Sequence, residues 1–174
     1  MLISTVWNLR NLLKISDNDF FIDSTGIYQI VSTVIIILFI YFLSPELSSS
    51  KFVFTTYYNE TGFNSKAFVS LIGLLTALYA FVGYEAGGAL AEETANPRVN
   101  APKGILETCI ISAILGFITI LAILYGCQEN IDFVLHGSGD SIYNLFFLVT
   151  NGKSGIAYFF TAIIASNVFF AGFF

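Results

Sequence analysis

The sequence has 174 residues, of which 56% are hydrophobic and only 11% are charged. Because soluble domains usually carry about 25% charged residues, this composition indicates a protein of the lipid bilayer and argues against an ordinary soluble domain. The formal net charge of −5 argues against a basic surface for nucleic acid, so we expect the bilayer as a partner and no nucleic acid.

Four apolar stretches are long enough, or nearly so, to cross a hydrocarbon core of about 30 Å as helices of about 20 residues. In chain order they cover about 27–44, 67–91, 105–126 and 155–174. Pro45 ends the first stretch, since proline does not continue a helix. The sequence therefore predicts an all-α, multi-pass integral membrane protein with four transmembrane helices.

Three polar segments connect these spans, at 45–66, 92–104 and 127–154. The distribution of lysine and arginine favours an inside N-terminus. This orientation makes 92–104 an inside loop and the other two segments outside loops. The only N-glycosylation sequon, Asn59-Glu60-Thr61, then lies outside.

The loop at 127–154 is interrupted by Gly137-Ser138-Gly139. Apolar residues then recur at the spacing of a short amphipathic helix. These are Ile142, Leu145, Phe146 and Val149.

No motif indicates an enzyme. The sequence contains no nucleophile–base pattern, phosphate-binding loop or dinucleotide fingerprint. His136 has no companions at the spacing of a metal site. Cys109 and Cys127 lie about 27 Å apart along one predicted helix, which is too far for a disulfide. We expect no cofactor.

The second span contains an acid and clustered glycines, which a plain membrane anchor avoids. Glu85 is the only acidic residue deep within a predicted span, where a carboxylate costs roughly 2.5–3.5 kcal/mol. Two interpretations remain open on these residues alone. Either Gly83-x-x-x-Gly87 is a helix-packing face and Glu85 a buried acid, or the helix unwinds here and binds a polar ligand through freed backbone groups.

The residues around this segment form a longer pattern. Phe81-Val82-Gly83-Tyr84-Glu85 precedes Ala91-Glu92-Glu93, an asparagine-containing link and Ala101-Pro102-Lys103-Gly104-Ile105. This order and spacing resemble the amino acid-polyamine-organocation permease superfamily, and more narrowly its eukaryotic GABA/choline branch. The segment Glu85-Ala86-Gly87-Gly88 differs from the motif found at this position in the branch that it most resembles. The exact substrate therefore stays open.

The resemblance implies a partial LeuT-like inverted-repeat bundle, in which this chain supplies transmembrane helices 5 to 8. Because the fourth span runs to Phe174, we expect the remaining helices to come from a longer protein. The implied function is secondary active transport of an amino acid or related amine (GABA, choline or polyamine class) by alternating access, coupled to H⁺ or Na⁺. The alternative is a non-transporting membrane scaffold, a partner subunit or a decayed permease.

The resemblance also implies a binding segment in the second span. Tyr79 offers an aromatic face to a cationic ligand, or else is a packing aromatic. Glu85 lies just beyond the segment and either carries a coupling proton or ties the broken helix to its neighbours. The implied substrate-binding residues are Tyr79, Ala80, Phe81, Val82, Gly83 and Glu85.

Other polar residues have less specific roles under this resemblance. Ser166 and Asn167 in the fourth span face the transport path, or are hydrogen-bonded within their own helix. Glu92 and Glu93 lie at the inner end of the second span, where we expect them to interact with Arg98, Lys103 or other groups of the inside loop and not with substrate.

Overall fold

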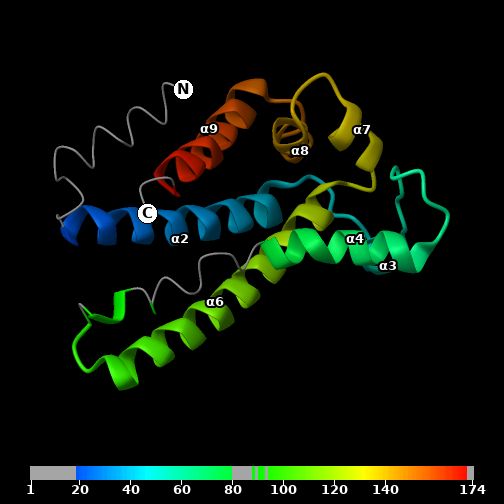
Figure 1. Cartoon of the computed structure of the whole chain (residues 1–174). Coiled ribbons are helices and arrows are strands. Elements are labelled where there is room, and N and C mark those ends of the chain that lie inside the picture. The colour runs from blue at the N-terminus through cyan, green and yellow to red at the C-terminus, as the bar shows by residue number, and fades with distance from the viewer. Residues whose placement is uncertain (1–18, 80–87, 89, 93, 172–174) are drawn as a thin grey trace, which may run out of the picture. The chain divides into compact units, whose positions relative to one another are not determined.

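The computed structural model describes residues 19–79, 88, 90–92 and 94–171. Within these residues the chain forms helices joined by loops, with no strand (Figure 1). The all-α class expected from the sequence is therefore confirmed. The helices are α2 (Asp19–Leu43), α3 (Ser50–Thr55), α4 (Lys66–Tyr79), the short η2 (Leu90–Glu92), α6 (Pro97–Gly126), α7 (Ile131–His136), α8 (Ser141–Val149) and α9 (Ser154–Ala171).

Three of these helices are long and apolar enough to cross a membrane: α2 from Ser24 onward, α6 and α9. They correspond to the first, third and fourth predicted spans. The second predicted span begins as α4, a shorter apolar helix that is described as far as Tyr79. Its continuation at residues 80–87 lies outside the described residues, so the four-span count stays a prediction.

Helix α6 begins at Pro97, inside the segment that the sequence predicted as an inside loop. Proline suits the first helical position, because its missing N–H would have no partner there. At 30 residues the helix is about 45 Å long, which exceeds a hydrocarbon core of about 30 Å. Hydropathy located only the apolar part of this helix, and its polar first turns extend beyond that part.

The structure divides into two compact units, which we describe separately. The first unit takes in the described residues of 1–53 and 122–174. In it, α8 packs against α7, α9 and α2, and α2 packs against α9. Its buried core joins residues from α2, α7, α8 and α9 with Cys127, which follows α6. Its members are Ile36, Phe39, Ile40, Cys127, Val134, Leu145, Phe146, Val149, Ala157 and Phe160.

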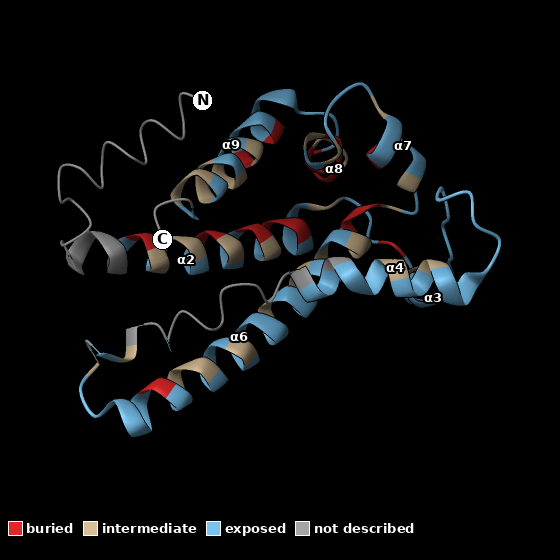
Figure 2. Ribbon diagram, in the orientation of Figure 1, coloured by how far each residue is buried: buried red, intermediate tan, exposed pale blue. Residues whose placement is uncertain are grey.

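The buried positions of α2 lie on one side of the helix, and the other positions of residues 24–43 are half-buried or exposed (Figure 2). The spacing of its buried positions follows the 3.6-residue repeat of a helix, so they share a single face. The face is polar near the start of the helix and apolar toward its end. Its members are Thr25, Ser32, Ile36, Phe39 and Ile40.

Helix α8 is the amphipathic stretch that the sequence predicted after the glycine break. Leu145, Phe146 and Val149 are all buried, whereas Ile142 is exposed at the first turn. Asn144 is fully buried among them and holds the preceding turn through its side-chain amide. The amide accepts from the backbone N–H of Gly139 at 3.0 Å and donates to the Gly139 carbonyl at 2.9 Å. The glycine break is thus an ordered turn.

A junction of polar groups joins the loop after α2 to the end of α6. The buried hydroxyl of Ser48 donates to the Leu124 carbonyl at 2.9 Å and accepts from the N–H of Glu129 at 3.0 Å. The Glu129 carboxylate in turn accepts from the hydroxyl and the N–H of Ser49, at 2.6 and 3.0 Å. Gln128 and Glu129 have positive φ angles, 51° and 59°, which residues other than glycine rarely adopt. These hydrogen bonds hold that turn in place.

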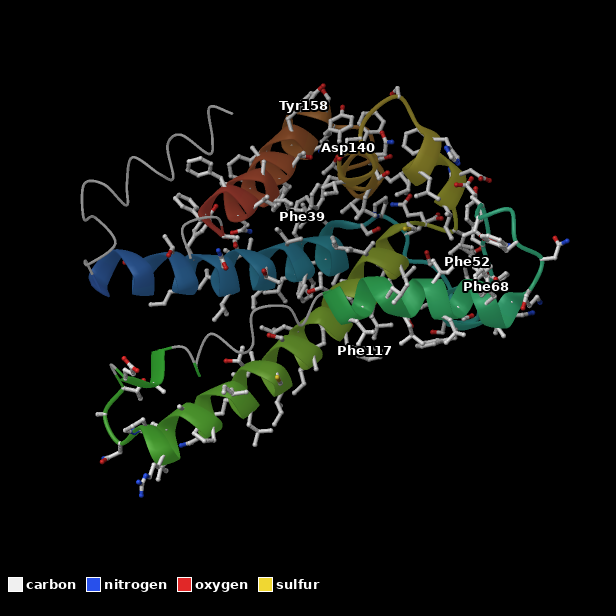
Figure 3. All side chains as sticks on the ribbon, in the orientation of Figure 1. Phe39, Phe52, Phe68, Phe117, Asp140 and Tyr158 are labelled. Carbon is white, nitrogen blue, oxygen red and sulfur yellow. The ribbon has the colours of Figure 1, made fainter. Side chains whose placement is uncertain are left out.

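The second unit takes in the described residues of 54–121, which include α4, η2 and most of α6. Only 6% of the most apolar window of α6 is buried, and apolar side chains cover the helix on all sides. Phe117, for example, points away from the ribbon and is 61% exposed (Figure 3). A helix that is apolar all round belongs in a protein core or in lipid, which agrees with a membrane span.

Candidate functional site

The binding segment expected from the sequence falls largely outside the described residues. Tyr79 is the last described residue of α4, and its side chain is not described. Ala80, Phe81, Val82, Gly83 and Glu85 all lie in the segment 80–87, outside the described residues. The proposed roles of these six residues therefore stay predictions.

A group of polar side chains does meet between two membrane-spanning helices, α2 and α9. We call the set Tyr28, Gln29, Ser32, Ser166 and Asn167 the α2–α9 polar seam. Tyr28 Oη lies 2.5 Å from Ser166 Oγ. Ser166 Oγ also donates to the Ile163 carbonyl at 2.7 Å, and a serine hydroxyl has only one hydrogen to give. Tyr28 is therefore the donor to Ser166.

Ser32 forms the second crossing of the seam. Its buried hydroxyl lies 3.0 Å from Asn167 Oδ1 and also 3.0 Å from the Gln29 carbonyl of its own helix. The single hydroxyl hydrogen of Ser32 is shared between these two acceptors. The bond to Asn167 joins α9 to α2 one helical turn away from Tyr28, so two hydrogen bonds connect the helices along one face.

Gln29 gives the seam a donor with no acceptor. Its Nε2 atom is buried and, among the described side chains, is the one such atom without a hydrogen-bond partner. Leaving a buried amide unpaired costs about 1–3 kcal/mol, so such a group usually meets water, a ligand or another part of the protein. Gln29 thus carries an open hydrogen-bonding position on α2, next in sequence to Tyr28.

A cavity of about 370 Å³ lies near the start of α2 and the end of α9. Its lining includes Ser24, Thr25, Tyr28 and Phe170. The rings of Tyr28 and Phe170 meet edge to face, with centroids 5.5 Å apart. Tyr28 therefore contributes to both the cavity wall and the seam, and the cavity is large enough to hold water beside these polar groups.

The seam offers neutral hydroxyl and amide groups, which bind and orient but do not carry charge. No cluster of three or more histidine, cysteine, aspartate or glutamate side chains that could hold a metal ion occurs among the described residues. Cys109 and Cys127 are both free, and burial raises the pKa of the Cys127 thiol to about 11. That thiol stays protonated near neutral pH and is a poor nucleophile.

Sequence reasoning found one side of the seam and missed the other. It weighed Ser166 and Asn167 as facing the path or as bonded within their own helix. Ser166 bonds both within α9 and to Tyr28 of α2, and a role of either residue in a transport path stays a prediction. It missed Tyr28, Gln29 and Ser32 on α2. Their signal is present in the sequence, because Ser32 follows Tyr28 by four residues and Gln29 by three, and both spacings put polar residues on one helix face.

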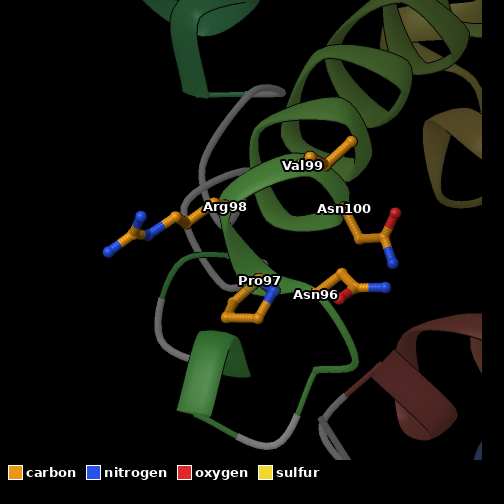
Figure 4. Close-up of a pocket in the computed structure, with 5 residues that line it drawn as sticks. All are labelled: Asn96, Pro97, Arg98, Val99 and Asn100. Carbon is orange, nitrogen blue, oxygen red and sulfur yellow. The ribbon is translucent and has the colours of Figure 1, made fainter.

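The polar segment 92–104 includes Lys103, whereas Glu93 lies outside the described residues, so the expected contacts of Glu92 and Glu93 stay predictions. Lys103 pairs with Glu107 on the next turn of α6, with 3.7 Å between nitrogen and oxygen, and both side chains are largely exposed. A hollow of about 480 Å³ lies at the start of this helix and is lined by the consecutive residues Asn96 to Asn100 (Figure 4). Its described lining comes from a single turn of chain.

The chain is similar to known amino acid permeases. The family model described as amino acid permease matches residues 19–173. The chain is 29% identical to "Amino-acid permease BAT1" of Arabidopsis thaliana, over 94% of this chain and 33% of that protein. It is 29% identical to the homolog of that permease in Oryza sativa, over 93% of this chain and 33% of the relative.

A more distant relative carries another substrate in its name. The "Choline transporter" of Saccharomyces cerevisiae is 25% identical, over 84% of this chain and 25% of that protein. The chain spans about a third of the length of the plant relatives that it matches. No solved structure matches the chain.

Proposed function

Because this chain belongs to the amino acid permease family, we propose that it acts as part of a secondary permease that moves an amino acid or a related amine across a membrane by alternating access. The family is one of transporters, not of enzymes, and the resemblance drawn from the motif around Glu85 is confirmed. With several apolar helices of spanning length, the chain is a multi-pass membrane protein.

The substrate class in this proposal follows the names of the relatives. They comprise amino-acid permeases and a choline transporter, whose substrates share a cationic nitrogen. Carbonyl groups freed by an unwound helix accept hydrogen bonds from an ammonium group, and an aromatic face suits a quaternary one. We assign these roles to the backbone of residues 79–83 and to the Tyr79 ring.

We propose that Glu85 stands beside this binding segment as the coupling or structural acid. A carboxyl group in a low-dielectric site is protonated more readily than in water, which suits coupling to H⁺. Coupling to Na⁺ is the alternative, with oxygen groups of the path as ligands. The rest of the transporter body would come from helices beyond those in this chain.

The structural observation that supports the proposal is the α2–α9 polar seam. Two hydrogen bonds across the seam join α2 to α9 within spans that are otherwise largely apolar. Polar groups within spans usually face a path or a partner, and the unpaired Nε2 of Gln29 leaves one donor available there. We propose that the seam borders the inner half of the transport path.

Uptake by the full reading frame tests this function. Cells that express it are to be assayed with labelled amino acids, GABA, choline and polyamines. Gly83→Leu, which fills the proposed binding segment, should abolish uptake at normal surface expression. Gly73→Leu is the matched control, since a Cβ at Gly73 of α4 meets no atom within 4 Å. That variant should keep most of the activity.

The outcomes separate transport from the alternative of a non-transporting scaffold or partner subunit. Equal uptake by the Gly83→Leu variant and the wild type would count against a ligand-lining role for this segment. An absence of uptake for every substrate in the unmodified full reading frame would favour the scaffold. For the chain as printed, we expect no uptake, because one binding helix does not enclose a ligand.

A further inference from the structure

The loop between α3 and α4 presents an ordered and exposed asparagine. Asn59 and Thr61 are both exposed, and they form the only Asn-x-Ser/Thr sequence in the chain. The loop lies between the end of α3 at Thr55 and the start of α4 at Lys66. A site of this kind needs an accessible asparagine on a surface loop.

The two key residues of the sequon already contact each other. Thr61 Oγ1 donates to Asn59 Oδ1 at 2.8 Å, and the Thr61 N–H donates to the same oxygen at 3.0 Å. Both bonds draw electron density toward Oδ1 and orient the amide plane. The hydroxyl of the third residue thus lies against the amide that would be modified.

The nitrogen of that amide keeps a hydrogen bond that modification can preserve. Asn59 Nδ2 donates to the Phe63 carbonyl at 2.8 Å. A primary amide carries two hydrogens, so replacing one of them by a sugar leaves the other to donate. Gly62, with φ at 77°, provides the turn that brings Phe63 back toward Asn59. The folded loop therefore accommodates a substituent at Nδ2.

Aromatic contacts hold both ends of this loop against the start of α4. The ring of Phe63 meets that of Phe68 edge to face, with centroids 4.9 Å apart. The ammonium group of Lys66 lies 5.4 Å from the centre of the Tyr57 ring. These contacts hold the two ends of the loop near α4, so Asn59 lies toward the tip.

We propose that Asn59 is an N-glycosylation site and that the loop from residue 45 to 66 faces the outside or lumenal compartment. The named relatives are proteins of plants and a fungus, whose cells attach oligosaccharides to such sequons in that compartment. The distribution of lysine and arginine independently puts this loop outside. Modification at Asn59 does not depend on which substrate the protein transports.

The reaction transfers a whole oligosaccharide from a lipid-diphosphate donor. Asn59 Nδ2 forms a bond to the first carbon of the sugar chain, and the bond from that carbon to the phosphate oxygen breaks. The lipid diphosphate leaves, and Nδ2 loses one proton. No oxidant or reductant takes part.

The test is electrophoretic mobility of the tagged full reading frame from eukaryotic cells, before and after treatment with peptide N-glycosidase. We expect enzyme treatment to shift the wild type to faster mobility. Asn59→Gln should remove the shift completely, whereas Thr61→Ser, which keeps a hydroxyl, should retain it. A wild type that does not shift would overturn the proposal.

Two engineered sequons check the orientation in the same assay. Lys153→Thr gives Asn151 a sequon in the loop between α8 and α9, which the proposal places on the same side as Asn59. Pro102→Thr gives one to Asn100, which the proposal places inside. Added modification in the first variant alone supports the orientation, and modification at Asn100 would overturn it.

Discussion

The rings of Phe39 on α2 and Phe160 on α9 are stacked, with centroids 3.6 Å apart and planes 26° from parallel. Phe39 points from α2 toward α9 (Figure 3). Phe146 of α8 contacts both rings, at 6.2 Å from Phe39 and 5.6 Å from Phe160. One buried side chain from each of three helices thus meets at a single point. Since lipid offers these helices no hydrophobic gain on association, close packing of this kind holds them together.

Removing the central ring should destabilise the first unit strongly. Phe160→Ala deletes a buried ring and leaves a cavity, which costs about 3–5 kcal/mol in protein cores. Phe159→Ala is the matched control, because its ring is 63% exposed on the same helix and should change stability by about 0.5 kcal/mol or less. Unfolding of the purified chain in detergent measures both variants. Equal losses would show that Phe160 is not part of a packed core.

The hydrogen bond between Tyr28 and Ser166 should appear as a coupling energy. A double-mutant cycle with Tyr28→Phe and Ser166→Ala should give about 0.6 kcal/mol, the average for such bonds between membrane helices, and at most about 1.7 kcal/mol. Thr161 provides the control, since its hydroxyl bonds only to its own helix, at the Ala157 carbonyl. The cycle of Tyr28→Phe with Thr161→Ala should give a coupling near zero. Equal couplings in the two cycles would contradict the assigned pair.

The junction at Glu129 should make the fold sensitive to acid. The hydroxyl of Ser49, and then its N–H, bond to the carboxylate and hold the pKa of Glu129 below its ordinary value of 4.5. Because folding lowers this pKa, the ionised carboxylate stabilises the folded state above about pH 4.5. The stabilisation is lost as the pH falls from there through the folded-state pKa.

The wild type and two variants, Ser49→Ala and Glu129→Gln, test this pH dependence, and we expect their sensitivity to acid to decrease in that order. Acid should destabilise the wild type most, and Ser49→Ala less, since only the backbone donor remains. Glu129→Gln, which has no charge to lose, should lack this part of the dependence. Unfolding midpoints from about pH 7 to about pH 3 give the comparison. Identical profiles for all three would mean that the junction does not respond to ionisation.

Much of the fold was predictable because a bilayer imposes strict rules on composition and length. Three predicted spans correspond to α2, α6 and α9, and the amphipathic stretch near Phe146 is α8. The helix bounds were less predictable, as at Pro97, because a helix continues into polar residues wherever its own hydrogen bonds allow. The family followed from the motif around Glu85, but the geometry of that motif lies outside the described residues.

The candidate seam was half predictable. Ser166 stands out in α9 as a polar residue in an apolar span, and Tyr28 gives the same signal in α2. Nothing local says that the two residues meet, because more than 130 positions separate them in the sequence. The same holds for the contact of Ser49 with Glu129, where a surface loop bonds to the turn after a span.

The sequence by itself determined that this protein belongs in a lipid bilayer, that it is helical and which family it belongs to. Hydropathy, length and motif order are properties of consecutive residues. Only the tertiary structure decided which residues meet, such as Phe39 with Phe160 and Tyr28 with Ser166, and that the buried amide of Gln29 has no partner. These pairings depend on the register and rotation of one helix against another. Many side chains distant in the chain set that geometry together, and no local pattern records it.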